Sequence, residues 1–266
     1  MKTKFTIGQY YPGESLIHNL DPRVKLVGVF IFIIILFMIN NIFGYLLTMA
    51  CLGVAVAVSR VPIMFILRGL RGIIFILLFT TILNIFFTPG ETVLFEFRWI
   101  KITLEGLIIA GKMSLRLCLL LIGSSLLTLT TSPIELTDAL EYIMKPLKRI
   151  GIPAHEIAMM MTIALRFIPT LMEEMEKIMK AQTARGADFD TGGVIKKARS
   201  LIPLLVPLFI SSFRRADELA MAMEARCYRG DVNRTRMNVL KLQRRDYRAG
   251  FILSVFVAGV MLLNLI

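Results

Sequence analysis

The chain has 266 residues, of which 56% are hydrophobic, and its 31 Lys and Arg against 19 Asp and Glu give a formal net charge of +12 at pH 7. With a mean hydropathy of +0.71 it is too apolar for a soluble protein of this size, and we expect an all-α membrane protein. About twenty of the basic residues lie between Ser132 and Arg248, which favours the cytoplasmic face of a membrane over a nucleic-acid partner.

The N-terminal segment, residues 1–25, is polar and lacks the apolar core of a signal peptide. Asp21 and Pro22 are typical of a helix N-cap followed by proline at the first helical position. We therefore expect a cytoplasmic N-terminal segment that leads directly into a helix.

Five apolar runs predict about five transmembrane helices, four within residues 26–131 and a C-terminal one within residues 249–266. The runs are Leu26–Ile39, Ile42–Val58, Ile73–Phe87, Leu107–Leu127 and Phe251–Ile266. Most of them are shorter than the roughly 20 residues that cross a bilayer. Flanking Lys and Arg side chains can extend to the interface and lengthen the effective span.

The segments between the runs predict the orientation. The stretch from Arg60 to Arg71 is basic and is expected to be a cytoplasmic loop. From Glu91 to Thr103 apolar and charged residues alternate, which predicts a short external hairpin with Trp99 near the interface.

Two basic residues, Lys112 and Arg116, interrupt the fourth run and share one face of its helix. Either they extend to the membrane surface or pack at a helix interface, or they line a path for a substrate. The sequence alone leaves both interpretations open.

Residues 132–248 predict a cytoplasmic module of three long helices. Ser132-Pro133-Ile134-Glu135 has the pattern of a capping box, and Gly151 suits the left-handed position after the first helix. Pro203 and Pro207 predict a kink near the start of the third helix. The helices are expected at 133–150, 153–185 and 195–226.

The second and third of these helices end on the same signature. The two segments are Ala184-Arg185-Gly186 and Ala225-Arg226-Cys227. An arginine at a helix C-terminus can simply complement the helix dipole, for up to about 1 kcal/mol. Two copies in one basic module favour a functional role, because a guanidinium on a rigid helix end suits a bidentate contact with a partner's carboxylate.

Motifs of common enzymes are missing from the sequence. It contains no GxxxxGK[S/T], HExxH or GxSxG pattern, and its three cysteines have no CxxC spacing. We therefore expect no catalytic residue, no metal site and no cofactor in this chain. If the protein takes part in driven transport, the energy should come from another subunit.

Several motifs resemble one known family, the transmembrane T component of energy-coupling factor (ECF) transporters, also called the EcfT/CbiQ family. The motifs are SLIHNLDPRVK at 15–25, LLTLTTSP at 126–133, LRFIP at 165–169 and AQTARG at 181–186. The resemblance covers most of the chain, and AQTARG is its most specific part. Ala225-Arg226-Cys227 departs from the family's Ala-Arg-Gly at its third position, which puts the cap geometry there in question.

The resemblance implies partners that this sequence does not contain. Two cytoplasmic ABC-type ATPases, which would bind ATP and Mg²⁺, would each bind one of Arg185 and Arg226. A membrane-embedded S component would capture a vitamin or a transition-metal ion. Candidate contacts with that S component are Met160, Met161, Leu204 and Leu205. The complex would lie in a bacterial or archaeal plasma membrane, with the module in the cytoplasm.

Two other function classes compete with this one. A self-sufficient secondary transporter or channel would use Lys112 and Arg116 in its path. A membrane enzyme is disfavoured by the missing catalytic motifs.

Overall fold

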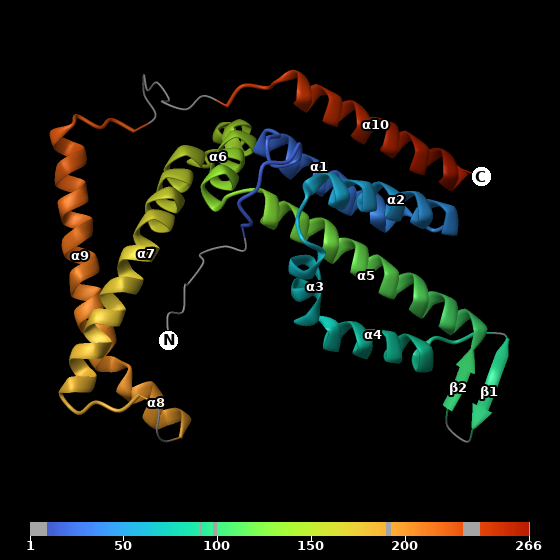
Figure 1. Cartoon of the computed structure of the whole chain (residues 1–266), viewed down its shortest axis with the longest axis horizontal. Coiled ribbons are helices and arrows are strands. Elements are labelled where there is room, and N and C mark those ends of the chain that lie inside the picture. Colours follow the sequence, from blue (N-terminus) through green and yellow to red (C-terminus); the bar gives the residue numbers. More distant parts are fainter. Residues whose placement is uncertain (1–9, 91, 98–99, 190–192, 231–239, 266) are drawn as a thin grey trace. The chain divides into compact units, whose positions relative to one another are not determined.

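The computed structural model describes residues 10–90, 92–97, 100–189, 193–230 and 240–265. The chain forms two compact units, Met1–Ala139 with Val239–Ile266, and Leu140–Asn238. Helices make up most of both units, as expected for an all-α membrane protein (Figure 1). The second unit falls inside the 132–248 range predicted for the module.

The first unit holds the apolar helices and one hairpin. Its elements are α1 (Pro22–Met38), α2 (Ile42–Ser59), α3 (Ile63–Arg71), α4 (Ile74–Phe87), β1 (Val93–Phe97), β2 (Ile100–Thr103), α5 (Leu104–Thr130), the start of α6 (Pro133–Met144) and α10 (Arg244–Leu265). Strands β1 and β2 pair antiparallel, which confirms the predicted hairpin. Trp99 lies outside the described residues.

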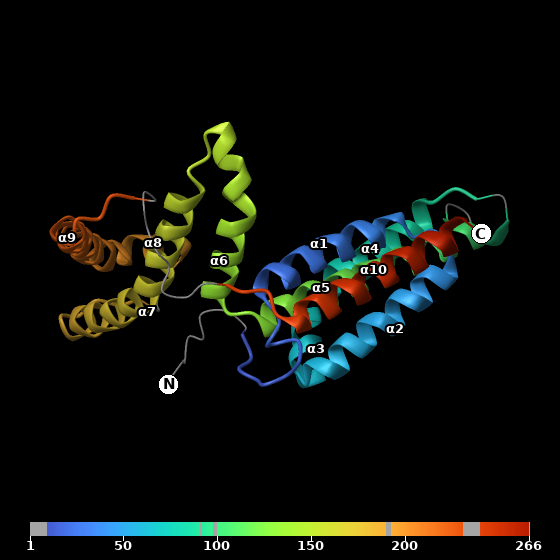
Figure 2. The same cartoon turned by 90° about the horizontal axis from the view of Figure 1, so that it is seen from above.

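Helices α1, α2, α5 and α10 form the core of this unit and run side by side (Figure 2). Buried side chains from all four meet there, among them Leu36, Tyr45, Leu119 and Val260. Helices α1 and α5 approach closely at Gly123, where an added Cβ would lie 2.6 Å from the ring of Phe32.

The outward faces of the same helices are also apolar. Large side chains such as Phe43 and Phe251 are 65% and 70% exposed. Apolar residues on both the inside and the outside are typical of a helix bundle whose solvent is lipid.

Three described helices, α2, α5 and α10, are long and apolar enough to cross a membrane. Helices α3 and α4, bent by 61° at their junction, provide a fourth span if they count as one. Helix α1 has 17 residues, the lower end of the roughly 17–25 that span a bilayer. These five segments correspond to the five predicted runs.

The prediction of a loop from Arg60 to Arg71 is wrong, because Ile63–Arg71 forms helix α3. Its apolar residues recur with helical spacing, so α3 is an amphipathic helix with Arg68 and Arg71 in its last turn. The basic residues suggested a loop, but the amphipathic pattern determines the structure here.

Lys112 and Arg116 lie at a helix interface. The Arg116 guanidinium donates to the carbonyl of Ile39 at 2.9 Å and to the hydroxyl of Tyr45 at 3.1 Å. Lys112 Nζ donates to the carbonyl of Asn40 at 3.1 Å. Both side chains therefore bind the backbone of the turn between α1 and α2, whose carbonyls have no helical partner.

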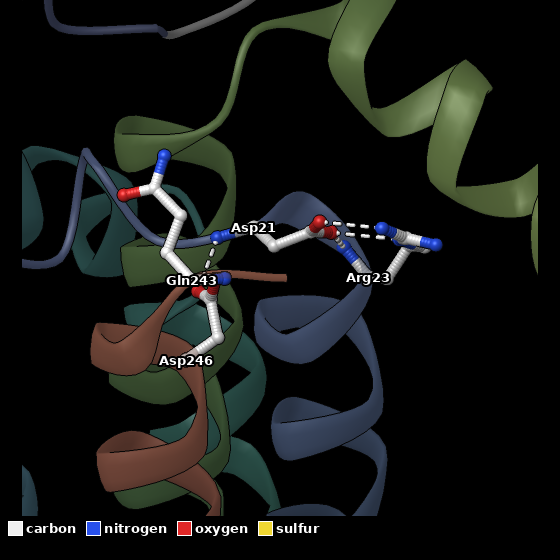
Figure 3. Close-up of polar contacts among 4 residues, drawn as sticks. All are labelled: Asp21, Arg23, Gln243 and Asp246. Atoms are coloured by element: carbon white, nitrogen blue, oxygen red, sulfur yellow. Dashed lines mark hydrogen bonds and ion pairs between the residues drawn. The ribbon is translucent and has the colours of Figure 1, made fainter. Parts of the chain in front are cut away.

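One carboxylate joins the starts of α1 and α10 (Figure 3). Asp246 accepts from the backbone N–H of Asp21 at 2.8 Å and from that of Gln243 at 2.7 Å. Asp21 itself caps α1 and accepts from the Arg23 guanidinium and backbone N–H. Burial would raise the pKa of Asp21, but these hydrogen bonds outweigh it and hold the pKa below its usual value.

A second buried contact ties α1 to the end of α5. Lys25, 8% exposed, donates from Nζ to the carbonyl of Thr130 at 2.9 Å and to that of His18 at 3.0 Å. Two residues further along, Ser132 and Glu135 form the predicted capping box of α6. Lys25 therefore holds the backbone immediately before α6 begins.

The second unit contains the end of α6 followed by η1 (Lys145–Ile150), α7 (Ala154–Ala184), α8 (Val194–Ser200) and α9 (Ile202–Ala225). The α-helix predicted to reach Ile150 ends at Met144 and continues as a 3₁₀ turn, because Pro146 cannot donate a helical hydrogen bond. Gly151 has the predicted left-handed conformation, with φ 88°.

The third predicted helix, 195–226, is two helices and not one kinked helix. It breaks at Leu201, and Pro203 then occupies the first turn of α9. Proline is favoured at that position, since its missing N–H would have no helical partner there. Pro207 lies inside α9 without ending it.

We predict that Lys25→Met destabilises the first unit. The carbonyls of Thr130 and His18 would lose their donor, at a cost of about 1–3 kcal/mol. At roughly 2–4 °C per kcal/mol, the apparent Tm of the purified protein in detergent should fall by several degrees. Lys112→Met is the matched control, because it removes one exposed hydrogen bond and should shift Tm less. Equal shifts in the two variants would contradict the role given to Lys25.

Candidate functional site

Helices α7 and α9 pack against each other and run in opposite directions (Figure 1). An ion pair links them, with Arg215 Nη2 2.7 Å from Glu174 Oε2. The two side chains are 32% and 29% exposed, so the pair contributes at most about 1 kcal/mol. The ion pair nevertheless marks the place where the two helices meet.

The two predicted arginines are at equal distances along the chain from this contact. Arg185 lies eleven residues beyond Glu174, and Arg226 lies eleven residues beyond Arg215. At 1.5 Å per residue each helix extends about 16 Å past the ion pair. Because the helices are antiparallel, the arginines lie at opposite ends of the pair, about 30 Å apart.

Both helices end in the same hydrogen-bonded turn. At the first tip, which we define as Ala184–Gly186, the N–H of Gly186 donates to the carbonyl of Thr183 and the N–H of Ala187 to that of Gln182. This is the Schellman arrangement.

The second tip, Ala225–Cys227, repeats these bonds at the same offsets. The N–H of Cys227 donates to the carbonyl of Glu224, and that of Tyr228 to the carbonyl of Met223. Arg226 has φ −90° and ψ 11°, against −88° and 7° for Arg185. The backbone at the two arginines therefore has the same conformation.

The departure from Ala-Arg-Gly does not change the cap. Cys227 takes φ 54° where Gly186 takes φ 88°, so both lie in the left-handed region. A left-handed residue other than glycine costs roughly 1–2 kcal/mol. The other contacts of the second tip must hold Cys227 in that conformation.

Tyr228 supplies such contacts at the second tip. Its hydroxyl lies 3.0 Å from the sulfur of Met159 and 3.2 Å from Nε2 of His155. The other ring nitrogen of His155 lies 3.0 Å from Glu141. The second tip is thus attached to α6 and to the start of α7, whereas Ala187 after the first tip has no polar side chain.

All six predicted tip residues are exposed. Arg185 and Arg226 each cap the negative end of a helix dipole, which leaves room for a further anionic group at the guanidinium. Each tip can therefore bind a carboxylate of another protein through charge-assisted hydrogen bonds.

The four candidate S-component contacts do not form one cluster. Met160, Met161 and Leu205 are 58%, 39% and 58% exposed, whereas Leu204 is 4% exposed. Met160 and Met161 lie before Glu174 on α7, and Leu205 lies before Arg215 on α9. Since the helices are antiparallel, the methionines and Leu205 lie on opposite sides of the ion pair.

A larger apolar surface on α9 was missed by the sequence analysis. Its members are 53–66% exposed and recur every three or four residues: Ile202, Leu205, Val206, Phe209, Ile210 and Phe213. That spacing was visible in the sequence as an apolar stripe. We call this set the α9 stripe. Exposed apolar surfaces of this kind commonly mark contact sites.

Within the described part of the chain, no three His, Cys, Asp or Glu residues are grouped so that they could hold a metal ion.

Comparison with known proteins identifies relatives over most of the chain. The family described as CbiQ, cobalt transport protein, matches residues 13–237. A protein of Clostridium kluyveri named energy-coupling factor transporter transmembrane protein EcfT is 57% identical over 253 residues, which cover 95% of this chain and 94% of that protein.

Proteins with the same name from Ruminiclostridium cellulolyticum and Bacillus subtilis are 55% and 47% identical, and each alignment covers at least 97% of both chains. A family match over most of the sequence, with relatives this similar along nearly their whole length, shows that the chain belongs to the CbiQ family.

Proposed function

We propose that this chain is the transmembrane energy-coupling subunit of an ECF-type importer. It would join two cytoplasmic ATPases, which bind ATP and Mg²⁺, to an S component that captures a vitamin or a transition-metal ion. The observation that carries the proposal is the pair of arginine tips, which end in the same hydrogen-bonded turn at opposite ends of α7 and α9.

Each tip would bind one ATPase through an acidic groove. A separation of about 30 Å gives each arginine its own partner, since no single side-chain cluster could reach both. When the ATPases bind and hydrolyse ATP, their relative movement would act on the two ends of the helix pair. Rigid caps matter here, because a frayed helix end would absorb the movement.

The apolar surfaces of the same helices would face the S component. The α9 stripe is the main candidate surface, and it includes Leu205. Met160 and Met161 would add a second contact beyond the ion pair. Leu204 is buried within this chain and would support the stripe from beneath. Movement of α7 against α9 would then change the surface that the S component meets.

The positions of basic residues support a cytoplasmic location for the N-terminal segment and the tips. The competing secondary-transporter hypothesis relied on Lys112 and Arg116. Both now have structural roles at the turn between α1 and α2. No specific observation favours that alternative.

The direct test is to isolate the chain from its native membrane in mild detergent and identify what copurifies. Two ATPases and a small apolar membrane protein are expected. Gradient-driven uptake into liposomes by the purified chain alone would instead support a self-sufficient transporter.

We predict that the double variant Arg185→Glu/Arg226→Glu inserts in the membrane but no longer retains the ATPases. Reversing the charge at a hydrogen-bonded ion pair should cost at least about 2–5 kcal/mol per contact, so retention should fall more than thirtyfold. Each single variant keeps one tip and should retain an intermediate amount.

Arg199→Glu/Arg214→Glu is the matched control, because it reverses two exposed arginines away from the tips. It should retain the ATPases. Equal loss in both double variants would show a general effect of charge and would contradict a specific role for the tips.

We further predict that ATPase binding depends on the backbone conformation at position 227 and not on the thiol of Cys227. Cys227→Gly should preserve ATPase binding, because glycine adopts positive φ without strain. Cys227→Val and Gly186→Val should weaken it, since β-branched residues rarely adopt that conformation. An added Cβ at Gly186 meets no atom within 4 Å. Any loss of ATPase binding in Gly186→Val would therefore come from the changed backbone conformation and not from a steric clash. If Cys227→Gly fails like Cys227→Val, the thiol itself is needed.

A further inference from the structure

An apolar groove with a volume of about 740 Å³ lies among α1, α2, α5 and α10 of the first unit. Apolar side chains such as Val29, Val54, Leu126 and Ile252 line it. Its volume is within the range of about 300–1,000 Å³ that is typical of ligand clefts. Neither the tips nor the α9 stripe belongs to it.

One end of the groove is positively charged. Arg245 and Arg248 are the charged residues of its lining within the described chain, and both are exposed. They lie three residues apart in the first turns of α10, on one face of the helix. The positive end of the α10 dipole lies at the same place.

Asp246 lies between the two arginines in the sequence and is 4% exposed. Its carboxylate accepts hydrogen bonds from the backbone N–H groups of Asp21 and Gln243 (Figure 3). The arginine end of the groove is therefore available to an anion.

Leu16, Ile17 and Leu20 of the N-terminal segment also line the groove. Val58 and Leu126, near the ends of α2 and α5, are lining residues as well. The arginines thus stand where helices α1, α2, α5 and α10 meet the segments that connect them, and the apolar body extends along the helices. At a membrane interface, this is the arrangement of a headgroup and its acyl chains.

We propose that the groove binds an anionic phospholipid, with the phosphate at Arg245 and Arg248 and an acyl chain along the apolar walls. A free phosphate ion would use the arginines alone and leave the groove empty. A zwitterionic lipid would fill the groove, but its headgroup has no net negative charge to attract the arginines. Basic sites between transmembrane helices are suited to anionic headgroups. This proposal does not depend on the coupling function.

The test is native mass spectrometry of the full purified chain with added palmitoyl-oleoyl phosphatidylglycerol or phosphatidylcholine. Phosphatidylglycerol should occupy the protein at least fivefold more than phosphatidylcholine. Arg245→Gln/Arg248→Gln should reduce its occupancy to the phosphatidylcholine level. Arg244→Gln should leave it nearly unchanged, because this neighbouring arginine on the same helix does not line the groove.

The apolar part is tested by filling the groove. Ala55→Trp and Ala50→Trp each place a large side chain on the α2 wall and should reduce phosphatidylglycerol binding at least fivefold, with size-exclusion profiles confirming the fold. Unchanged binding in folded variants would overturn the proposal. So would equal binding of both lipids, equal loss in Arg244→Gln, or complete displacement by millimolar inorganic phosphate.

Discussion

The contact between Glu174 and Arg215 joins the two helices of the pair on which the proposed function depends. The ion pair is solvated and too weak to hold α7 and α9 together, which is the task of their packed side chains. If one helix slid along the other by one helical turn, the separation of the two arginines would change by about 5 Å. With the observed register, both arginines extend equally far from the contact.

Features encoded by a few neighbouring residues were predictable from the sequence. The Asp21 cap, the capping box at Ser132 and Glu135, the left-handed Gly151 and the hairpin are all present. Each depends on hydrogen bonds within a short segment, so residue type and spacing determine it. The errors at Ile63–Arg71 and at Leu201 come from residues with two local meanings. Arginine fits an amphipathic helix as well as a loop, and proline can either bend a helix or start one.

Features that depend on distant residues were not predictable. The sequence contained both arginines, but it did not show that α7 and α9 are antiparallel or that the arginines lie at opposite ends. It left two roles open for Arg116, because only the folded chain brings the carbonyl of Ile39 to its guanidinium. No local pattern shows that Lys25 is a buried donor to the carbonyl of Thr130, 105 residues away.

The tips have the same geometry but different support, and this bears on how movement would pass through the second unit. Tyr228 attaches the second tip to Met159 and His155, and the strained φ of Cys227 persists within that setting. The first tip relies on Gly186, which adopts the same turn without strain. Force applied at Arg226 would reach the start of α7 directly through these side chains. Force applied at Arg185 would travel along α7 and past Pro169 before it reached the same place. The two tips can therefore have the same geometry for binding and still differ in how directly they are connected to the start of α7.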